Sequence, residues 1–286
     1  KFIRNLSVLS SLALVPGMKL NNSTHTNELK MKLGLVTYLW GKDWDIPTII
    51  KNLTEAKIHG VELRIEHAHG VTLDLKKEER LAVKQMFSDS PIEVLGMGTN
   101  QEYDSPDPEK LKKQIEGTLD YIILSHDIGG TGVKVKPNRF HEGVPQEKTL
   151  EQIGMALNEV GRFAGDYGQQ IRVEVHGKGT QQLPNIKTIM DVADNPNVTV
   201  CWNSNNQDLD GEGLEHNFNL VKNRFGDTVH VRELNVGEYP YQQLMSLFVE
   251  MDYTGWICLE CRTDPEDKVK ALIEQREIFE KMINSD

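Results

Sequence analysis

Short apolar segments alternate with amphipathic helical segments along nearly the whole chain, and this alternation limits the possible folds more than any other feature. The apolar segments have the length and β-branched content of strands and cover residues 33–38, 60–64, 91–97, 132–136, 171–177, 198–203, 228–233 and 256–260. The helical segments follow at residues 46–56, 76–86, 108–124, 147–164, 186–192, 214–225, 241–251 and 268–283. Strict alternation of this kind predicts a parallel sheet whose strands are joined by helical crossovers.

Eight strand–helix units within about 250 residues favour a closed barrel over an open sheet. The predicted fold is α/β: a single (β/α)8 TIM barrel over residues 31–286, with parallel strands and outer helices. No Gly-x-Gly-x-x-Gly motif follows the first strand segment, which is evidence against an open dinucleotide-binding sheet.

Residues 1–30 differ from the rest of the chain. Lys1 and Arg4 precede an apolar run at residues 6–15, which ends at Pro16 and Gly17. A basic start, a short apolar run and a helix breaker resemble a secretory signal peptide, and the run is too short to span a bilayer. We therefore predict a leader and polar linker over residues 1–30, with export to the periplasm if the leader functions and a cytoplasmic location otherwise.

Composition narrows the classes of partner. The 286 residues carry a formal net charge of −11, with 38% hydrophobic and 26% charged residues. An acidic chain has no general attraction to nucleic acid or anionic membranes, so we expect neither as a partner. Cys258 and Cys261 form a C-x-x-C pair, but without a second such pair core packing is the simpler role.

Side chains capable of chemistry gather where the later strands end. The fifth to eighth strand segments end near Glu174, Asn203, His230 and Glu260, respectively. Catalytic groups of such barrels lie at the C-terminal ends of the strands, so these four side chains should meet in one site. Two carboxylates, an imidazole and an amide oxygen suit Mn²⁺, Mg²⁺ or Co²⁺, and could take Zn²⁺. A divalent metal there would polarise a substrate carbonyl, while the carboxylates move a proton at the neighbouring carbon through an enediolate.

The segments Gly60–Arg64, Val173–His176, His230–Glu233 and Leu259–Glu260 resemble the xylose isomerase-like barrel superfamily of sugar isomerases and epimerases. Similarity to its ketose 3-epimerase branch implies that Glu174 and Glu260 are both metal ligands and the catalytic acid and base. It also implies that His230 is a ligand. The chain departs from this branch at the sixth strand, where Asn203 replaces the usual Asp and Asn206 replaces the usual His. One anion fewer should weaken metal binding.

A wider set of strand-end residues is expected to contact the substrate, which we expect to be a small sugar or sugar derivative. These residues are Glu62, Arg64, Lys136, His176, Asn205, Arg232, Glu233 and Trp40. For several of them a structural role is the alternative: Glu62 and Arg64 could form an orienting ion pair, and Lys134 and Lys136 could brace carboxylates. Trp40 could belong to the core instead of stacking on a sugar ring.

The favoured function is a metal-dependent sugar isomerase or epimerase, and other functions stay open. The substitutions at Asn203 and Asn206 allow a carbohydrate-binding barrel without turnover. A lyase or hydrolase acting on oxidised sugars also fits the superfamily. A phosphodiesterase of the endonuclease branch would need a richer His/Asp set than this acidic chain shows. A homo-oligomer is possible by analogy with other barrels.

Overall fold

The computed structural model describes residues 31–284. The leader and linker predicted over residues 1–30 lie outside these residues, so the leader and the export that depends on it stay predictions. Within the described chain, no helix has both the length and the apolar composition needed to cross a membrane.

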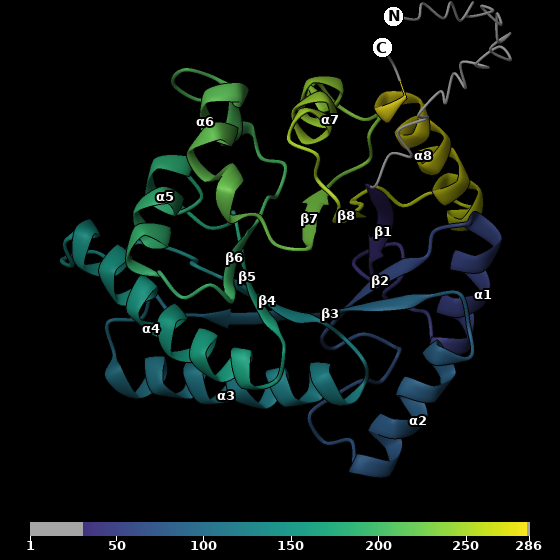
Figure 1. The fold of residues 1–286 in the computed structure, drawn as a ribbon, viewed down its shortest axis with the longest axis horizontal. Helices are drawn as coiled ribbons and strands as arrows, with labels where there is room; N and C mark the ends of the chain where they lie inside the picture. Colours follow the sequence, from purple (N-terminus) through teal and green to yellow (C-terminus); the bar gives the residue numbers. More distant parts are fainter. Residues whose placement is uncertain (1–30, 285–286) are drawn as a thin grey trace, which may run out of the picture.

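Eight parallel strands form the centre of the molecule in the order β6-β5-β4-β3-β2-β1-β8-β7 (Figure 1). They are β1 (Lys32–Val36), β2 (Gly60–Arg64), β3 (Glu93–Glu102), β4 (Gly132–Lys136), β5 (Gln170–Glu174), β6 (Val198–Cys201), β7 (Thr228–Val231) and β8 (Trp256–Leu259). The ring closes between β6 and β7, where the His230 amide donates to the Trp202 carbonyl at 2.6 Å and Asn203 bridges to His230. The predicted (β/α)8 barrel is confirmed.

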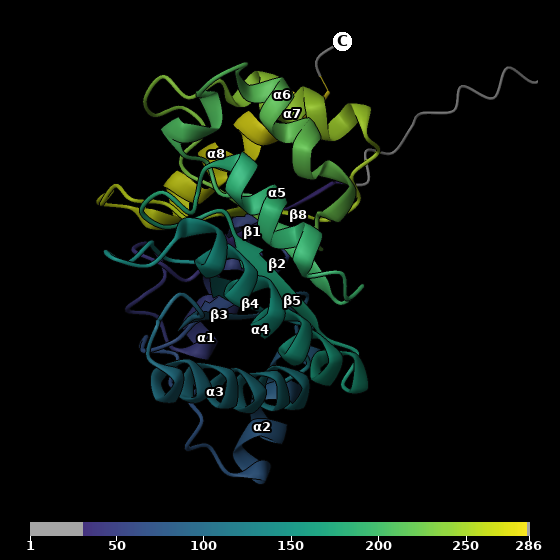
Figure 2. The same ribbon diagram turned by 90° about the vertical axis from the view of Figure 1, so that its left-hand side faces the viewer.

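The described residues form eight α-helices. These helices lie around the outside of the strands in both perpendicular views (Figures 1 and 2). They are α1 (Ile46–Ala56), α2 (Lys77–Ser88), α3 (Pro108–Asp127), α4 (Gln146–Asp166), α5 (Leu183–Val192), α6 (Leu214–Val221), α7 (Tyr241–Glu250) and α8 (Lys268–Ile283). Capping residues decide where several of them begin. The Asp45 carboxylate accepts a hydrogen bond from the Thr48 amide at 2.9 Å, which satisfies one free N–H of the first turn of α1.

The two faces of each strand are used differently. In β2, the side chains of Val61 and Leu63 are fully buried in the main hydrophobic core. Full burial of such side chains stabilises the fold by about 1.5–3 kcal/mol each. Because strand side chains alternate, Glu62 and Arg64 lie on the opposite face, which is the barrel interior. In β2, one face therefore packs in the hydrophobic core and the other face directs polar side chains into the barrel interior.

The N-terminal end of the barrel is closed by a buried arginine. Arg172 is only 1% exposed, and its guanidinium donates to the Leu95 carbonyl and the Thr131 hydroxyl, each at 2.7 Å. Leu95 lies near the start of β3, and Thr131 directly precedes β4. Both are therefore nearer to the N-terminal end of the barrel than Glu174, the last residue of β5. Arg172 therefore occupies the barrel interior on the N-terminal side of Glu174.

Candidate active site

The four side chains predicted as metal ligands lie together. Glu174 is the last residue of β5, His230 lies within β7, and Glu260 follows β8 directly. One potential ligand atom from each of these three residues lies within 4.8 Å of the others. Asn203, just after β6, joins them through its amide nitrogen, which donates to Glu174 Oε1 at 2.7 Å.

Glu174 is the most heavily bonded member of this group. Its second oxygen, Oε2, accepts a hydrogen bond from the Lys134 ammonium at 2.8 Å, and both side chains are 2% exposed. Burial disfavours the carboxylate, but Lys134 and His230 outweigh this effect and hold the pKa of Glu174 well below its usual range. Glu174 is therefore ionised at neutral pH.

His230 is oriented by Glu62 from across the barrel. His230 Nε2 lies 3.2 Å from Glu62 Oε2, and both side chains are fully buried. In metal sites, the histidine nitrogen that does not bind the metal commonly donates to a carboxylate. This hydrogen bond orients the other ring nitrogen toward the metal. Burial alone would lower the pKa of His230, but Cys201 and Glu62 help to raise it well above its ordinary value. A cation bound at Nδ1 would therefore displace a proton.

Glu260 differs from Glu174 although the two are neighbours. It is 6% exposed, and its carboxylate has no hydrogen-bond partner among the described residues. Burial, followed by the negative charge of Glu174, raises the pKa of Glu260. Two adjacent carboxyl groups whose pKa values move in opposite directions can act as a base and an acid.

These donors fit a divalent cation. Asn203 Oδ1 and His230 Nδ1 are buried without a hydrogen-bond partner among the described residues. Unpaired buried polar atoms are costly, and a bound cation would satisfy Asn203 Oδ1 and, after displacing a proton, His230 Nδ1. Together with the carboxylates of Glu174 and Glu260, they form an oxygen-rich set with one imidazole, as Mn²⁺, Mg²⁺ or Co²⁺ prefer.

A small polar cavity of about 70 Å³ opens above this cluster. Its lining includes five of the predicted residues, namely Glu174, Glu260, His176, Arg64 and Lys136, and four of its side chains are cationic. The full lining is Tyr38, Arg64, Lys134, Lys136, Glu174, His176, Glu260 and Arg262. Arg64 and Lys136, which were predicted to bind substrate, are thus at the mouth of the barrel.

Four residues of this region, Tyr38, Asn100, Lys134 and Arg262, were not among the predicted site residues. Strand alternation had placed Lys134 on the same face of β4 as Lys136, with the bracing of a carboxylate as one role, and Lys134 does bond to Glu174. Arg262 lies two positions after Glu260, so alternation could have identified it. Tyr38 could have been identified in the same way, because it lies two positions after Val36. Asn100 could not: the third strand was predicted to end at residue 97, but β3 continues to Glu102.

The other predicted contacts hold the loops around the site. The Asn205 amide donates to the carbonyls of Val175 and Asn203 and so ties the end of β5 to the end of β6. Glu233 Oε1 accepts hydrogen bonds from the backbone amides of Arg262 and Thr263 at 2.9 and 2.6 Å.

Trp40 is 2% exposed, and its indole N–H donates to the Thr263 carbonyl at 2.9 Å. Arg232 is half-buried, and its Nε has no hydrogen-bond partner among the described residues. Direct contacts of these two residues, and of Asn205 and Glu233, with a substrate stay predictions.

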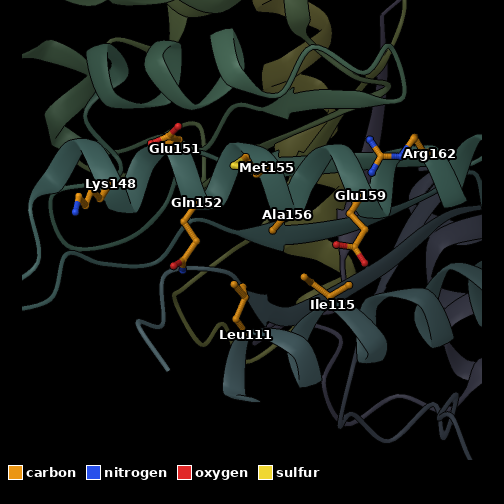
Figure 3. Close-up of a pocket in the computed structure, with 9 residues that line it drawn as sticks. All are labelled: Leu111, Ile115, Lys148, Glu151, Gln152, Met155, Ala156, Glu159 and Arg162. Carbon is orange, nitrogen blue, oxygen red and sulfur yellow. The ribbon is translucent and has the colours of Figure 1, made fainter. Parts of the chain in front are cut away.

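A larger groove of about 590 Å³ lies on the outer surface between α3 and α4 (Figure 3). Leu111 and Ile115 of α3 face Met155 and Ala156 of α4 across it, and charged side chains of α4 surround them. None of its lining residues belongs to the polar cluster inside the barrel. Within residues 31–284, the cluster of potential metal ligands lies at the barrel mouth, which we therefore take as the candidate active site.

Solved structures that share this fold include two sugar epimerases and a zinc-containing protein. The 3-keto-D-glucoside 4-epimerase YcjR from E. coli is 13% identical, with a TM-score of 0.75 over 88% of this chain and 99% of its own. D-Allulose 3-epimerase from Methylomonas sp. is 15% identical, with a TM-score of 0.73 over 88% and 98%. The IolI protein with a bound zinc atom is 14% identical, with a TM-score of 0.72 over 88% and 98%.

At these identities, structural similarity establishes the fold alone. No curated protein is significantly similar to the chain in sequence. A family model, described as xylose isomerase-like TIM barrel, matches residues 50–282, which is most of the chain. The chain therefore belongs to the xylose isomerase-like TIM barrel family.

Proposed function

We propose that this protein is a sugar isomerase or epimerase that moves a proton at a carbon beside a carbonyl group, assisted by a divalent cation. The observation that carries the proposal is the buried cluster of Glu174, His230 and Glu260, whose ligand atoms lie within 4.8 Å of one another. The cluster lies at the C-terminal ends of the strands, where barrel enzymes bind their substrates.

Glu174, Asn203, His230 and Glu260 would hold the cation. When bound, it would polarise the substrate carbonyl and the neighbouring hydroxyl, which makes the proton on the carbon between them more acidic. The unpaired Oδ1 of Asn203 and Nδ1 of His230 support this assignment. The substitution of Asn203 for the family's Asp removes one negative charge but leaves a carbonyl oxygen as a ligand.

The two glutamates are suited to opposite halves of the proton transfer. Glu174 and Glu260 form the proposed acid/base pair, in which one carboxyl group removes the proton from carbon and the other returns a proton to the enediolate. The pKa of Glu174 is lowered and that of Glu260 is raised. Both carboxyl groups are almost completely buried, so bulk water has little access to the proton during the transfer.

The relatives in fold support the same reaction class. Two of the three structures described above are named as sugar epimerases, and the third holds a zinc atom. A small sugar substrate and metal dependence are therefore proposed for this chain as well. A homo-oligomer stays a prediction.

The proposal is tested by metal content and by exchange of carbon-bound protons. Protein purified without chelator should contain close to one equivalent of Mn, Mg, Co or Zn by elemental analysis. Glu260→Gln should lose most of it, whereas the exposed control Glu250→Gln should retain it. Incubation with ketoses in D₂O should then incorporate deuterium beside the carbonyl, as read by NMR, and Glu174→Gln should abolish the incorporation.

One observation favours a second function, a carbohydrate-binding barrel without turnover. Both carboxylate oxygens of Glu174 already accept hydrogen bonds, from Lys134 and Asn203. If these bonds keep the cation out, the site would bind sugars without catalysing proton transfer. Sugar binding with neither metal uptake nor deuterium exchange would favour this second function. Cleavage of an oxidised sugar in the same screen would favour a lyase or hydrolase.

A further inference from the structure

Four cationic side chains line the barrel mouth, but only one of them is neutralised by a close carboxylate. Lys134 is bonded to Glu174 at 2.8 Å. Within the described residues, Arg64, Lys136 and Arg262 have no carboxylate within the 4.0 Å of an ion pair, although all three line the same cavity as Lys134. Lys134 therefore braces a catalytic carboxylate, whereas Lys136 does not.

Arg64 and Lys136 converge on one neutral acceptor. Asn100 Oδ1 accepts a hydrogen bond from Arg64 Nη2 at 3.1 Å and another from Lys136 Nζ at 2.8 Å. Two positive charges held by one amide oxygen repel each other, and partial burial strengthens the repulsion. Two carboxylates do act on Lys136 from a distance, those of Glu174 and Glu102. Neither lies close enough to pair with it.

The composition of the chain does not account for this cluster. The protein has 43 acidic and 32 basic residues, so unpaired cations are not expected to gather by chance at the cavity above the two glutamates. The cavity also contains His176, whose Nδ1 is buried without a hydrogen-bond partner. A guanidinium and an ammonium on one side of a cavity are well suited to the oxygens of a carboxylate or a phosphate.

The position of the cations indicates which part of a substrate they would contact. Arg64 and Lys136 come from β2 and β4, with Asn100 of β3 between them. Glu174, His230 and Glu260 come from β5, β7 and β8. A sugar bound across the mouth would place its reacting carbon near the glutamates and another of its groups on the β2–β4 side.

We propose that the substrate is an anionic sugar whose carboxylate or phosphate group binds Arg64 and Lys136. The proposal rests on the proposed function for the position of the reacting carbon, but the binding of the acidic group can be measured separately. An anion would satisfy two cations that now share one amide oxygen, and it would leave Lys134 bonded to Glu174.

The test compares acidic and neutral sugars on the full chain with added Mn²⁺ at low ionic strength. The probes are D-glucuronate with D-glucose, and D-fructose 6-phosphate with D-fructose, titrated by calorimetry. The wild type should bind one acidic probe at least about tenfold more tightly than its neutral partner. The probe that gains affinity identifies the acidic group as carboxylate or phosphate.

Variants test whether Arg64 and Lys136 are the cause of the higher affinity for the acidic sugar. Lys136→Met and Arg64→Met should each weaken binding of the acidic probe about tenfold, and should change binding of the neutral sugar by less than about threefold. The matched control Lys113→Met, at an exposed position on α3, should behave like the wild type. Equal binding of acidic and neutral sugars would overturn the proposal, as would a preference that survives Lys136→Met.

Failure of this inference is distinguishable from failure of the proposed function. Deuterium exchange into a neutral ketose without any preference for acidic sugars would retain the proposed function and reject the anionic substrate. Tight binding of an acidic sugar that Lys136→Met abolishes, without deuterium exchange, would retain the inference and reject the isomerase.

Discussion

Glu62 and His230 are 168 positions apart in the sequence, yet Glu62 Oε2 lies 3.2 Å from His230 Nε2 inside the barrel. Both side chains are fully buried. The contact occupies one nitrogen of the imidazole and leaves Nδ1 directed toward Glu174, 3.8 Å from its Oε1. Glu62 is therefore a positioning residue for the proposed metal site, although the sequence had suggested an ion pair with Arg64 as one of its roles.

The first prediction concerns this contact. Glu62→Gln retains the shape and the acceptor oxygen but removes the charge that makes the imidazole a better ligand. Metal affinity should fall about tenfold or more, because removal of an outer carboxylate partner typically costs that much. Competition with a fluorescent chelator measures the change, with Glu250→Gln as the control. An unchanged affinity would mean that Glu62 only fills space.

The second prediction concerns Asn203. Asn203→Asp restores a third carboxylate, which should tighten metal binding by about tenfold or more. Without metal, the same change replaces the hydrogen bond to Glu174 by repulsion between two buried carboxylates. The metal-free variant should therefore be less stable than the wild type by about 1–3 kcal/mol. Thermal unfolding with EDTA and with Mn²⁺ tests both parts, and a variant that is destabilised equally in both conditions would contradict the proposed ligand role.

The third prediction concerns Lys134. Lys134→Met leaves the buried Glu174 carboxylate without its cationic partner, a loss that typically costs about 3–5 kcal/mol. Bound metal supplies positive charge to the same carboxylate, so the destabilisation should be smaller with Mn²⁺ than with EDTA. Urea unfolding in the two conditions measures the difference. Equal losses would show that Lys134 and the metal do not act on the same carboxylate.

The fourth prediction concerns pH and Asp208, which supports the loop after β6. Its Oδ2 accepts hydrogen bonds from the backbone N–H of Asn205 at 2.8 Å and from the Tyr239 hydroxyl at 2.7 Å. Burial raises the pKa of Asp208 to about 7 from an ordinary value of 3.8. A pKa raised by folding means that the folded protein binds the proton more strongly, so stability is lost as the pH rises from about 4 through 7.

Asp208→Asn mimics the protonated side chain and should remove this part of the pH dependence. The rise in the pKa of Asp208 from 3.8 to about 7 corresponds to about 4 kcal/mol of stability as an upper limit. Urea unfolding at pH 5 and pH 8 measures it: the wild type should be less stable at pH 8, and the variant should show a smaller difference. If the unfolding free energy changes equally between pH 5 and pH 8 in both proteins, Asp208 is ionised in the folded state.

The sequence alone was sufficient for the fold and for the residues that reach the strand ends, because both follow from local patterns. Ile46, Ile49 and Leu53 recur at helical spacing, and all three are buried on α1. Val173 and Glu174 alternate along β5, so the pattern that predicts a strand also predicts which side chains enter the barrel. The barrel then brings the ends of β5 to β8 together whatever the details of the loops.

The tertiary structure alone decided which of these polar groups bond to one another. Lys134 and Lys136 are equivalent by alternation, yet one bonds to Glu174 and the other to Asn100. The distance from each lysine to Glu174 or Asn100 depends on how far each strand extends and on its register with the neighbouring strands. Asn100 lies in the part of β3 that runs five residues beyond its predicted end at residue 97. Local periodicity places a side chain on a face of a strand, but ion pairing depends on distances between strands that are far apart in the sequence.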